Sequence, residues 1–578
     1  MKLIEALQIE HADAPRGDKV CVCGLACSFI PLHLKTFVTA YLRRAFPDRA
    51  FSIKTGLYGD LAETVKRLDE QLDFALIVIE WPDLDPRLGL RTTGNWGPAS
   101  LAEIVRDAQA QLLRLQSAVE SLTARNVPVV ICLPTLPLPP LSFCRPYEAD
   151  SLQLNLRKLL DDLAVRLVNH SSVVFVSPAE LDRVSAPAVR HDVRAELASG
   201  FPYHLAHADH VARLLVELAK PRLPKKGLIT DLDDTLWLGI LGDDGVQGIS
   251  WDLDHNSQLH ATYQQLLNAL AEAGVMLAVA SNNDLSLVRE AFQRADLVLR
   301  PEHLYPVEAY RGPKSESITR ILQAWNVAPD SVVFVDDNGL ELAEVAAAYP
   351  EIECVLFPKK EPVAILDFFR LLRDRFGKRY IHDEDRGRVA SLRQSQAFHE
   401  TVHAATTLDS VLKSADGRLS FIYDKAPIDR RALELVNKTN QFNLNGKRYT
   451  EESWSSHLSR DNVWLQIADY QDRFARLGKI SVITGRREGS RLTIDTWVMS
   501  CRAFSRRIEY HCLEELLDSF GANEMELMFV PTERNGPLRD FLATLTGTLP
   551  EGRVSISRDA FRGKCPPLYH QKHQQVYG

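Results

Sequence analysis

Short apolar runs alternate with stretches of helical periodicity along the first part of the chain. The apolar runs predict buried strands, and the amphipathic stretches between them predict helices. Strands are expected at 20–24, 74–79, 129–133 and 173–176, and helices at 32–46, 99–125 and 150–169. This alternation is typical of a parallel sheet that is covered by helices on both faces.

The same alternation continues in a second region with clearer boundaries. Strands are expected at 227–231, 275–280, 332–335 and 354–356, and helices at 258–273, 285–294, 315–325 and 340–348. A third region has a different order of elements and is predicted to be α+β. The strands expected there are 419–423, 463–468, 479–484, 492–499 and 525–530, and the helices are 428–437 and 507–520. We therefore expect a multidomain α/β protein with domains at 1–224, 225–375 and 376–578.

Length and composition agree with several soluble domains. A chain of 578 residues is too long for a single core, and 45% hydrophobic with 25% charged residues is ordinary for a globular protein. The net charge of −8 argues against broad nucleic-acid binding. Residues 1–20 lack the apolar core of a secretory signal, and five prolines exclude a membrane helix at 127–144. We expect a cytoplasmic protein with no nucleic-acid or membrane partner.

The strongest chemical pattern is Asp231-Leu232-Asp233-Asp234-Thr235, directly after an apolar strand. Asp231 and Asp233 are two residues apart, so both leave the strand on the same side. Two such carboxylates at the carboxyl edge of a parallel sheet predict a cation between them, and oxygen ligands suit Mg²⁺. The first could attack phosphorus and the second could carry a proton. Alone, the pattern could also be a helix N-cap.

Three further groups follow in chain order at predicted strand ends or helix starts. Ser281-Asn282-Asn283 ends a buried strand and is suited to holding a phosphoryl oxygen. Lys314 begins a predicted helix, where its charge can neutralise phosphate. Asp336-Asp337 ends another apolar strand and supplies further metal ligands. Together these groups resemble the haloacid dehalogenase (HAD) superfamily.

The HAD resemblance implies a role for each residue. Asp231 is the nucleophile and a metal ligand, and Asp233 is the general acid/base, which also ligates the metal through its backbone carbonyl. Ser281 and Lys314 bind phosphate, with Asn282 and Thr235 as further substrate-binding residues. Asp336 holds the Mg²⁺ cofactor, and Asp337 does so directly or through water. About fifty residues separate Asp231 from Ser281, which excludes a large inserted cap, so the Rossmann-like HAD domain should be open to a bulky partner.

A narrower resemblance, to FkbH-like proteins of polyketide and related pathways, rests on the flap residues 235–245 and on the third region. The blocks 437–443, Arg448-Tyr449, 499–502, 506–509 and 531–535 fall in the order found in that family. The resemblance implies transfer of a glyceryl unit from 1,3-bisphosphoglycerate, a small phosphorylated metabolite, to the phosphopantetheine arm of an acyl carrier protein.

The outer domains carry resemblances of their own. The third resembles GNAT acyltransferases, which makes Cys501 a candidate acyl carrier and Arg502 and Arg506 candidate substrate-binding residues that would favour its thiolate. Cys501 could equally be a small core residue. The first resembles SGNH hydrolases. It is a degenerate member by this resemblance, because residues 24–28 and 207–210 do not match the catalytic blocks of working enzymes. A docking or structural role is expected for it.

Several departures from the family pattern put the acyl donor in doubt. Asn282 stands where the family usually has lysine, Ser505 where it has glycine, and Gly339 where it has proline. The residues 310–313 before Lys314 also differ from the usual Asn-Trp. Two alternatives therefore stay open: a phosphatase acting on a small or carrier-bound phosphate ester, and a non-catalytic scaffold of a biosynthetic assembly.

Overall fold

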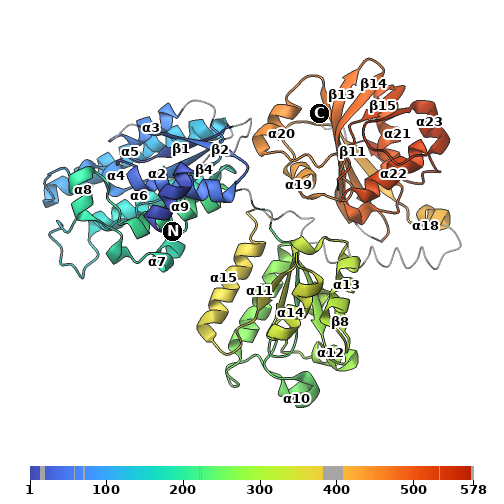
Figure 1. Ribbon diagram of the computed structural model, residues 1–578, viewed down its shortest axis with the longest axis horizontal. Coiled ribbons are helices and arrows are strands. Elements are labelled where there is room, and N and C mark those ends of the chain that lie inside the picture. The colour runs from blue at the N-terminus through green and yellow to red at the C-terminus, as the bar shows by residue number, and fades with distance from the viewer. Residues whose placement is uncertain are drawn as a thin grey trace. The chain divides into compact units, whose positions relative to one another are not determined.

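The computed structural model describes residues 1–12, 20–56, 59–68, 72–125, 127–220, 222, 224–379, 381, 393, 408–474, 476–532 and 534–574. The chain divides into two compact units, Met1–Arg222 and Leu223–Gly578. The first unit contains one sheet and the second contains two (Figure 1). Among the described residues, no helix is long and apolar enough to cross a membrane.

The first unit is built on a five-stranded parallel sheet with strand order β2-β1-β3-β4-β5. Its strands are β1 (Val20–Ala26), β2 (Ala50–Thr55), β3 (Phe74–Val78), β4 (Val129–Cys132) and β5 (Val173–Phe175). Its helices are α1 (Leu3–His11), α2 (Leu32–Ala45), α3 (Leu61–Arg67), α4 (Trp81–Leu84), α5 (Pro98–Ala124), α6 (Ser151–Leu167), α7 (Pro178–Val184), α8 (Val193–Ser199) and α9 (Leu205–Ala219). Two apolar clusters cover the two faces, one built with α2 and α9 and the other with α5 and α6.

Four of these strands lie where the apolar runs predict them, and the edge strand β2 was missed. None of its residues is fully buried. Its sequence therefore lacks the continuous apolar run that marks a strand covered on both faces.

The second sheet is also parallel, with strand order β10-β9-β6-β7-β8. Its strands are β6 (Gly227–Thr230), β7 (Met276–Ser281), β8 (Leu304–Ala309), β9 (Val332–Asp336) and β10 (Glu353–Leu356). Its helices are α10 (Leu241–Gly248), α11 (Gln258–Glu272), α12 (Leu285–Ala291), α13 (Lys314–Trp325), α14 (Gly339–Ala348) and α15 (Pro362–Phe376). Residues of α11 and α15 pack on one face and residues of α13 and α14 on the other (Figure 1).

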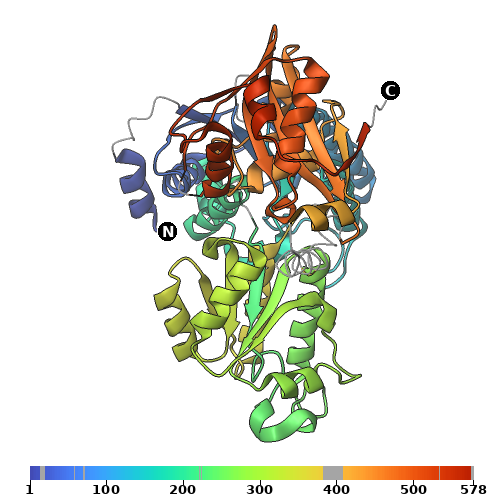
Figure 2. The same ribbon diagram turned by 90° about the vertical axis from the view of Figure 1, so that its right-hand side faces the viewer.

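The edge strand β8 was not predicted. Only Leu304 of this strand is buried, and Pro306 interrupts it, so its sequence shows neither an apolar run nor alternation. Between β6 and α11 the chain forms a short turn and the helix α10, with no inserted domain. In both views α10 lies beyond one end of the strands, where a small flap is expected (Figures 1 and 2).

The third sheet is mixed and seven-stranded, with order β16-β15-β14-β13-β12-β11-β17. Its strands are β11 (Arg418–Ile422), β12 (Val463–Gln471), β13 (Arg476–Glu488), β14 (Arg491–Met499), β15 (Glu524–Leu527), β16 (Val554–Ser557) and β17 (Gln571–Gln574). The β14/β15 and β11/β17 pairs are parallel and the other pairs are antiparallel. Its helices are α18 (Leu408–Ser414), α19 (Arg430–Lys438), α20 (Glu451–Leu458), α21 (Ile508–Phe520), α22 (Gly536–Thr546) and α23 (Arg558–Lys564).

The mixed sheet with helices fits the α+β prediction for this region. The resemblances of the first domain to SGNH hydrolases and of the third to GNAT acyltransferases stay predictions, as do the three domain boundaries.

Candidate active site

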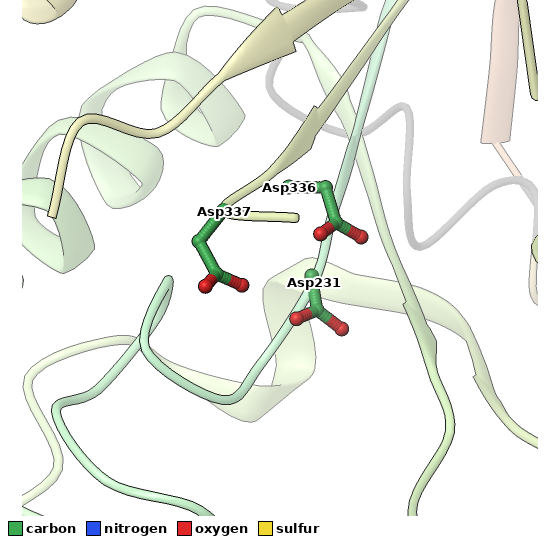
Figure 3. Close-up of side chains that lie close together, drawn as sticks. All are labelled: Asp231, Asp336 and Asp337. Atoms are coloured by element: carbon green, nitrogen blue, oxygen red, sulfur yellow. The ribbon is translucent and has the colours of Figure 1, made fainter. Parts of the chain in front are cut away.

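Asp231 and Asp336 meet because β6 and β9 are parallel neighbours in the middle of the second sheet. Thr230 pairs with Val335, and the Asp231 amide donates to the Val335 carbonyl at 2.9 Å, so the next residue of each strand emerges at the same edge. Asp337 follows directly. One carboxylate oxygen from each of the three aspartates lies within 4.8 Å of the others, and Figure 3 shows the three groups close together.

Lys314 places its ammonium group among these carboxylates. Its Nζ lies 2.5 Å from Asp231 Oδ1, 2.9 Å from Asp336 Oδ2 and 2.9 Å from Glu341 Oε2, and it donates to the Ala280 carbonyl at 3.0 Å. The side chain is buried. Burial alone would lower the pKa of Lys314, but the three carboxylates outweigh it and raise that pKa. Lys314 is therefore a fixed positive charge at the first turn of α13.

The two central carboxylates have perturbed acidities. Burial raises the pKa of Asp231, an effect opposed by Lys314 and reinforced by the nearby Asp336. Burial likewise raises the pKa of Asp336, and Lys314 again opposes the rise. Carboxyl groups that are buried and close together favour a bound cation, which stabilises their charged form.

Asp233 is held on both of its carboxylate oxygens. Oδ1 accepts from the Trp237 indole N–H at 3.1 Å and from the Leu241 amide at 3.0 Å. Oδ2 accepts from Asn283 Nδ2 at 2.9 Å, and the same amide donates to Ser281 Oγ at 3.0 Å. Asn283 thus links the end of β7 to the side chain expected to act as acid/base.

The other predicted phosphate-binding residues differ in access. Ser281 is buried at the end of β7. Asn282 is exposed, donates to Glu341 Oε1 at 3.1 Å and accepts from the Gly312 amide at 3.4 Å. Thr235 is fully buried, and among the described residues its hydroxyl has no hydrogen-bond partner. Asn282 can therefore meet a solute from solvent, whereas Thr235 is enclosed within the domain.

Sequence reasoning missed two charged residues of this site. Glu341 lies in the first turn of α14 and contacts both Lys314 and Asn282. Because that helix begins two residues after Asp337, the position of Glu341 in the sequence was a usable signal. Lys359, three residues beyond β10, contacts Asp234 and Asp337. It could have been suspected only from its place after a predicted strand.

The donor set fits a hard divalent cation. Three carboxylates lie close together, and carboxylate oxygens are ligands that Mg²⁺ prefers. The Lys314 ammonium already lies against two of them, so this position accommodates positive charge. Asp231, Asp336 and Asp337 are the residues that would hold the ion.

Of the three candidate residues of the third domain, Arg502 and Arg506 have side chains within the described part of the structure. Arg506 is 0% exposed; its Nε donates to Asp472 Oδ2 at 2.9 Å, and Asp472 is also 0% exposed. This placement makes Arg506 part of the interior rather than a surface that binds a substrate. Arg502 donates to Ser500 Oγ at 3.3 Å. Cys501 lies in a short 3₁₀ turn, and its side chain lies outside the described part of the structure.

The asparagines of the family-like blocks support the backbone of the third domain. Asn443 Oδ1 accepts from the Gly446 amide at 2.8 Å, and Asn437 is bonded in both directions to the backbone of Tyr449. Asn535 Nδ2 donates to the Asn443 carbonyl at 3.0 Å. Within the block 531–535, Glu533 lies outside the described residues. Through these contacts the asparagines of the blocks stabilise the backbone conformation of the third domain.

In the first domain, His207 lies in a buried polar network and not at a catalytic surface. Its ring nitrogens lie 2.9 Å from Thr135 Oγ1 and 2.9 Å from Ser185 Oγ. Burial lowers the pKa of His207 to about 3, so the ring is neutral. Cys21 and Cys23 are buried in the same domain's core, as predicted.

Comparisons with known proteins bear on the fold of the chain. No protein-family model and no curated protein matches the chain. A crystal structure of the N-terminal part of the protein BF1531 from Bacteroides fragilis, described as containing a phosphatase domain complexed with Mg, is similar at a TM-score of 0.51 and 18% identity. The match covers 65% of this chain and 99% of that one. A share of 65% exceeds the length of any one domain, so the shared fold extends over more than one. The chain therefore has an α/β fold similar to that protein, with a second sheet that is parallel and Rossmann-like.

Proposed function

We propose that the second domain is a Mg²⁺-dependent phosphatase or phosphotransferase of the HAD kind. The observation that carries the proposal is the meeting of Asp231, Asp336, Asp337 and Lys314 at one edge of the parallel sheet. The similarity to a phosphatase domain crystallised with Mg supports it. A bound Mg²⁺ would neutralise charge on the phosphoryl oxygens and on the carboxylates that hold it.

The residues divide the chemistry between them. Asp231 attacks phosphorus, so a bond forms between its carboxylate oxygen and phosphorus while the bond from phosphorus to the leaving oxygen breaks. Asp233 gives a proton to that leaving oxygen. Water then attacks phosphorus while the bond from phosphorus to Asp231 breaks, so phosphate leaves, and Asp233 takes a proton from that water. Lys314 and Ser281 bind the phosphoryl oxygens. Because no domain is inserted over the site, a large substrate can reach it.

The finer proposal is acyl transfer to the phosphopantetheine thiol of an acyl carrier protein. Attack of Asp231 on the phosphorus of an acyl phosphate would release a free carboxylate, and the activation of the acyl group would be lost. A thioester forms only if the thiol sulfur attacks the carbonyl carbon, whose bond to oxygen then breaks as phosphate leaves. In this reaction the acidic site binds the departing phosphate, and Asp231 need not form a covalent bond.

One experiment separates these reactions. The protein is incubated with Mg²⁺, 1,3-bisphosphoglycerate and a phosphopantetheinylated carrier protein, and both intact masses and free phosphate are measured. A glyceryl adduct on the carrier supports transfer, and one on this chain directs mapping to Cys501. Phosphate release without an adduct supports a phosphatase. Release that does not need Mg²⁺, or that survives in Asp231→Asn with a simple phosphate ester, refutes the proposed site.

A further inference from the structure

The orientation of the Asp233 carboxylate depends on the turn that follows it. Two of its three hydrogen-bond donors, the Trp237 indole and the Leu241 amide, belong to the next eight residues. The third, Asn283, comes from the end of β7. We call residues 234–241 the flap turn. If this turn shifts, Asp233 loses two donors and its direction changes.

One lysine ties the flap turn to the opposite side of the site. Lys359 Nζ lies 2.7 Å from Asp234 Oδ2 and 2.6 Å from Asp337 Oδ2. The other oxygen of Asp234 accepts from the Gly239 amide at 3.0 Å, and the Asp234 amide donates to the Gly239 carbonyl at 3.3 Å. Asp234 thus closes the turn with one oxygen and fastens it to Lys359 with the other.

The backbone of Asp234 is in a conformation that needs such support. Its φ of 51° lies in the left-handed region, which residues other than glycine seldom adopt. A residue stays in that region where surrounding contacts hold it. Here these contacts are the ion pair with Lys359 and two hydrogen bonds to the Gly239 backbone, one from the Asp234 amide and one accepted by its carboxylate.

Lys359 is itself held by the core of the domain. The Lys359 amide donates to the Phe357 carbonyl at 3.0 Å, and the Phe357 amide donates to the Asp336 carbonyl at 2.9 Å. The Phe357 ring is buried against His260 and Tyr263 of α11. The backbone that carries the Lys359 side chain is therefore held in place, although 31% of that side chain is exposed.

We infer that Lys359 is a positioning residue that aims the acid/base Asp233 by fastening the flap turn, through Asp234, to Asp337. The inference rests on the proposed phosphatase chemistry of this site. Proton donation by Asp233 matters most for leaving groups that are basic, and little for leaving groups that depart as stable anions. Loss of Lys359 should therefore affect alkyl phosphates far more than aryl phosphates.

The test compares three variants: Lys359→Met, the conservative Lys359→Arg and the control Lys360→Met, whose lysine is exposed at the next position. The comparison uses kcat/KM, which reports the steps up to departure of the leaving group and not the later attack of water. With Mg²⁺, Lys359→Met should lower kcat/KM for glycerol 2-phosphate by about 100-fold, the low end of general acid catalysis. For p-nitrophenyl phosphate the loss should stay within about threefold on the same ground. Lys359→Arg should keep most of the wild-type activity on glycerol 2-phosphate, because a guanidinium can also bridge two carboxylates. Equal losses on both substrates would overturn the inference.

A measurement without turnover separates this inference from the proposed function. Hydrogen exchange of peptides that contain the Gly239 and Leu241 amides should become faster in Lys359→Met and stay unchanged in Lys360→Met. Unchanged exchange in Lys359→Met overturns the fastening of the flap turn. If the wild-type protein hydrolyses neither ester, the proposed function fails, and the exchange result alone decides whether Lys359 holds the turn.

Discussion

Replacing Lys314 with methionine tests whether the acidic cluster needs a positive charge at its centre. The ammonium group is 2% exposed and lies within 3 Å of oxygens from Asp231, Asp336 and Glu341. Removing one partner of a buried ion pair leaves uncompensated charge and costs about 3–5 kcal/mol. The second domain should lose about that much stability when no metal is bound.

The cost should depend on pH in a defined direction. Burial raises the pKa of Asp231 while Lys314 holds it down, so the variant raises it further. A group whose folded-state pKa lies above its unfolded value stabilises the fold at low pH, and this contribution is lost as pH rises through the folded pKa. The difference between Lys314→Met and wild type should therefore be larger at pH 8 than at pH 6.

Hydrogen exchange of the buried strands β6 and β9 measures this stability within the full chain, because their amides exchange only when the domain opens. In EDTA at pH 8, Lys314→Met should speed this exchange by roughly two to four orders of magnitude, since about 1.4 kcal/mol is a factor of ten. Excess Mg²⁺ should reduce the difference, because the ion supplies the missing charge. An increase below tenfold in EDTA would refute the reasoning, and Lys360→Met serves as the control.

Three further changes test other parts of the structure. Burial lowers the pKa of His207 to about 3, so the first unit should lose stability as pH falls from about 6.5 towards 3, by up to about 1.4 kcal/mol per pH unit. The variant His207→Gln, which can still form a hydrogen bond to Thr135, should show a smaller pH dependence of the free energy of unfolding in urea. Phe357→Ala removes a buried ring and should cost the second domain about 3–5 kcal/mol, seen as faster exchange of its strands. Asp472→Asn breaks a fully buried pair with Arg506 and should destabilise the third domain by about 3–5 kcal/mol while leaving kcat for phosphate release unchanged.

The sequence alone determined the central strands and the candidate catalytic aspartates. Strands covered on both faces must be continuously apolar, so β6, β7 and β9 are visible as runs that end in polar residues. The carboxyl edge of a parallel sheet then brings those ends together without further information. Edge strands such as β2 and β8 are half exposed and carry no such pattern, so they escaped prediction.

Only the tertiary structure decided which charged groups contact one another. Lys359 and Asp234 are 125 residues apart in sequence, and no local pattern can pair them. Their contact exists because β10 lies beside β9, which places the residues after β10 next to Asp337. Burial is also a property of the packed domain. Arg506 was a candidate substrate-binding residue from the sequence, yet the fold encloses its side chain with that of Asp472. Sequence periodicity reports which face of an element is apolar, whereas the pairing of buried charges depends on the neighbours that packing supplies.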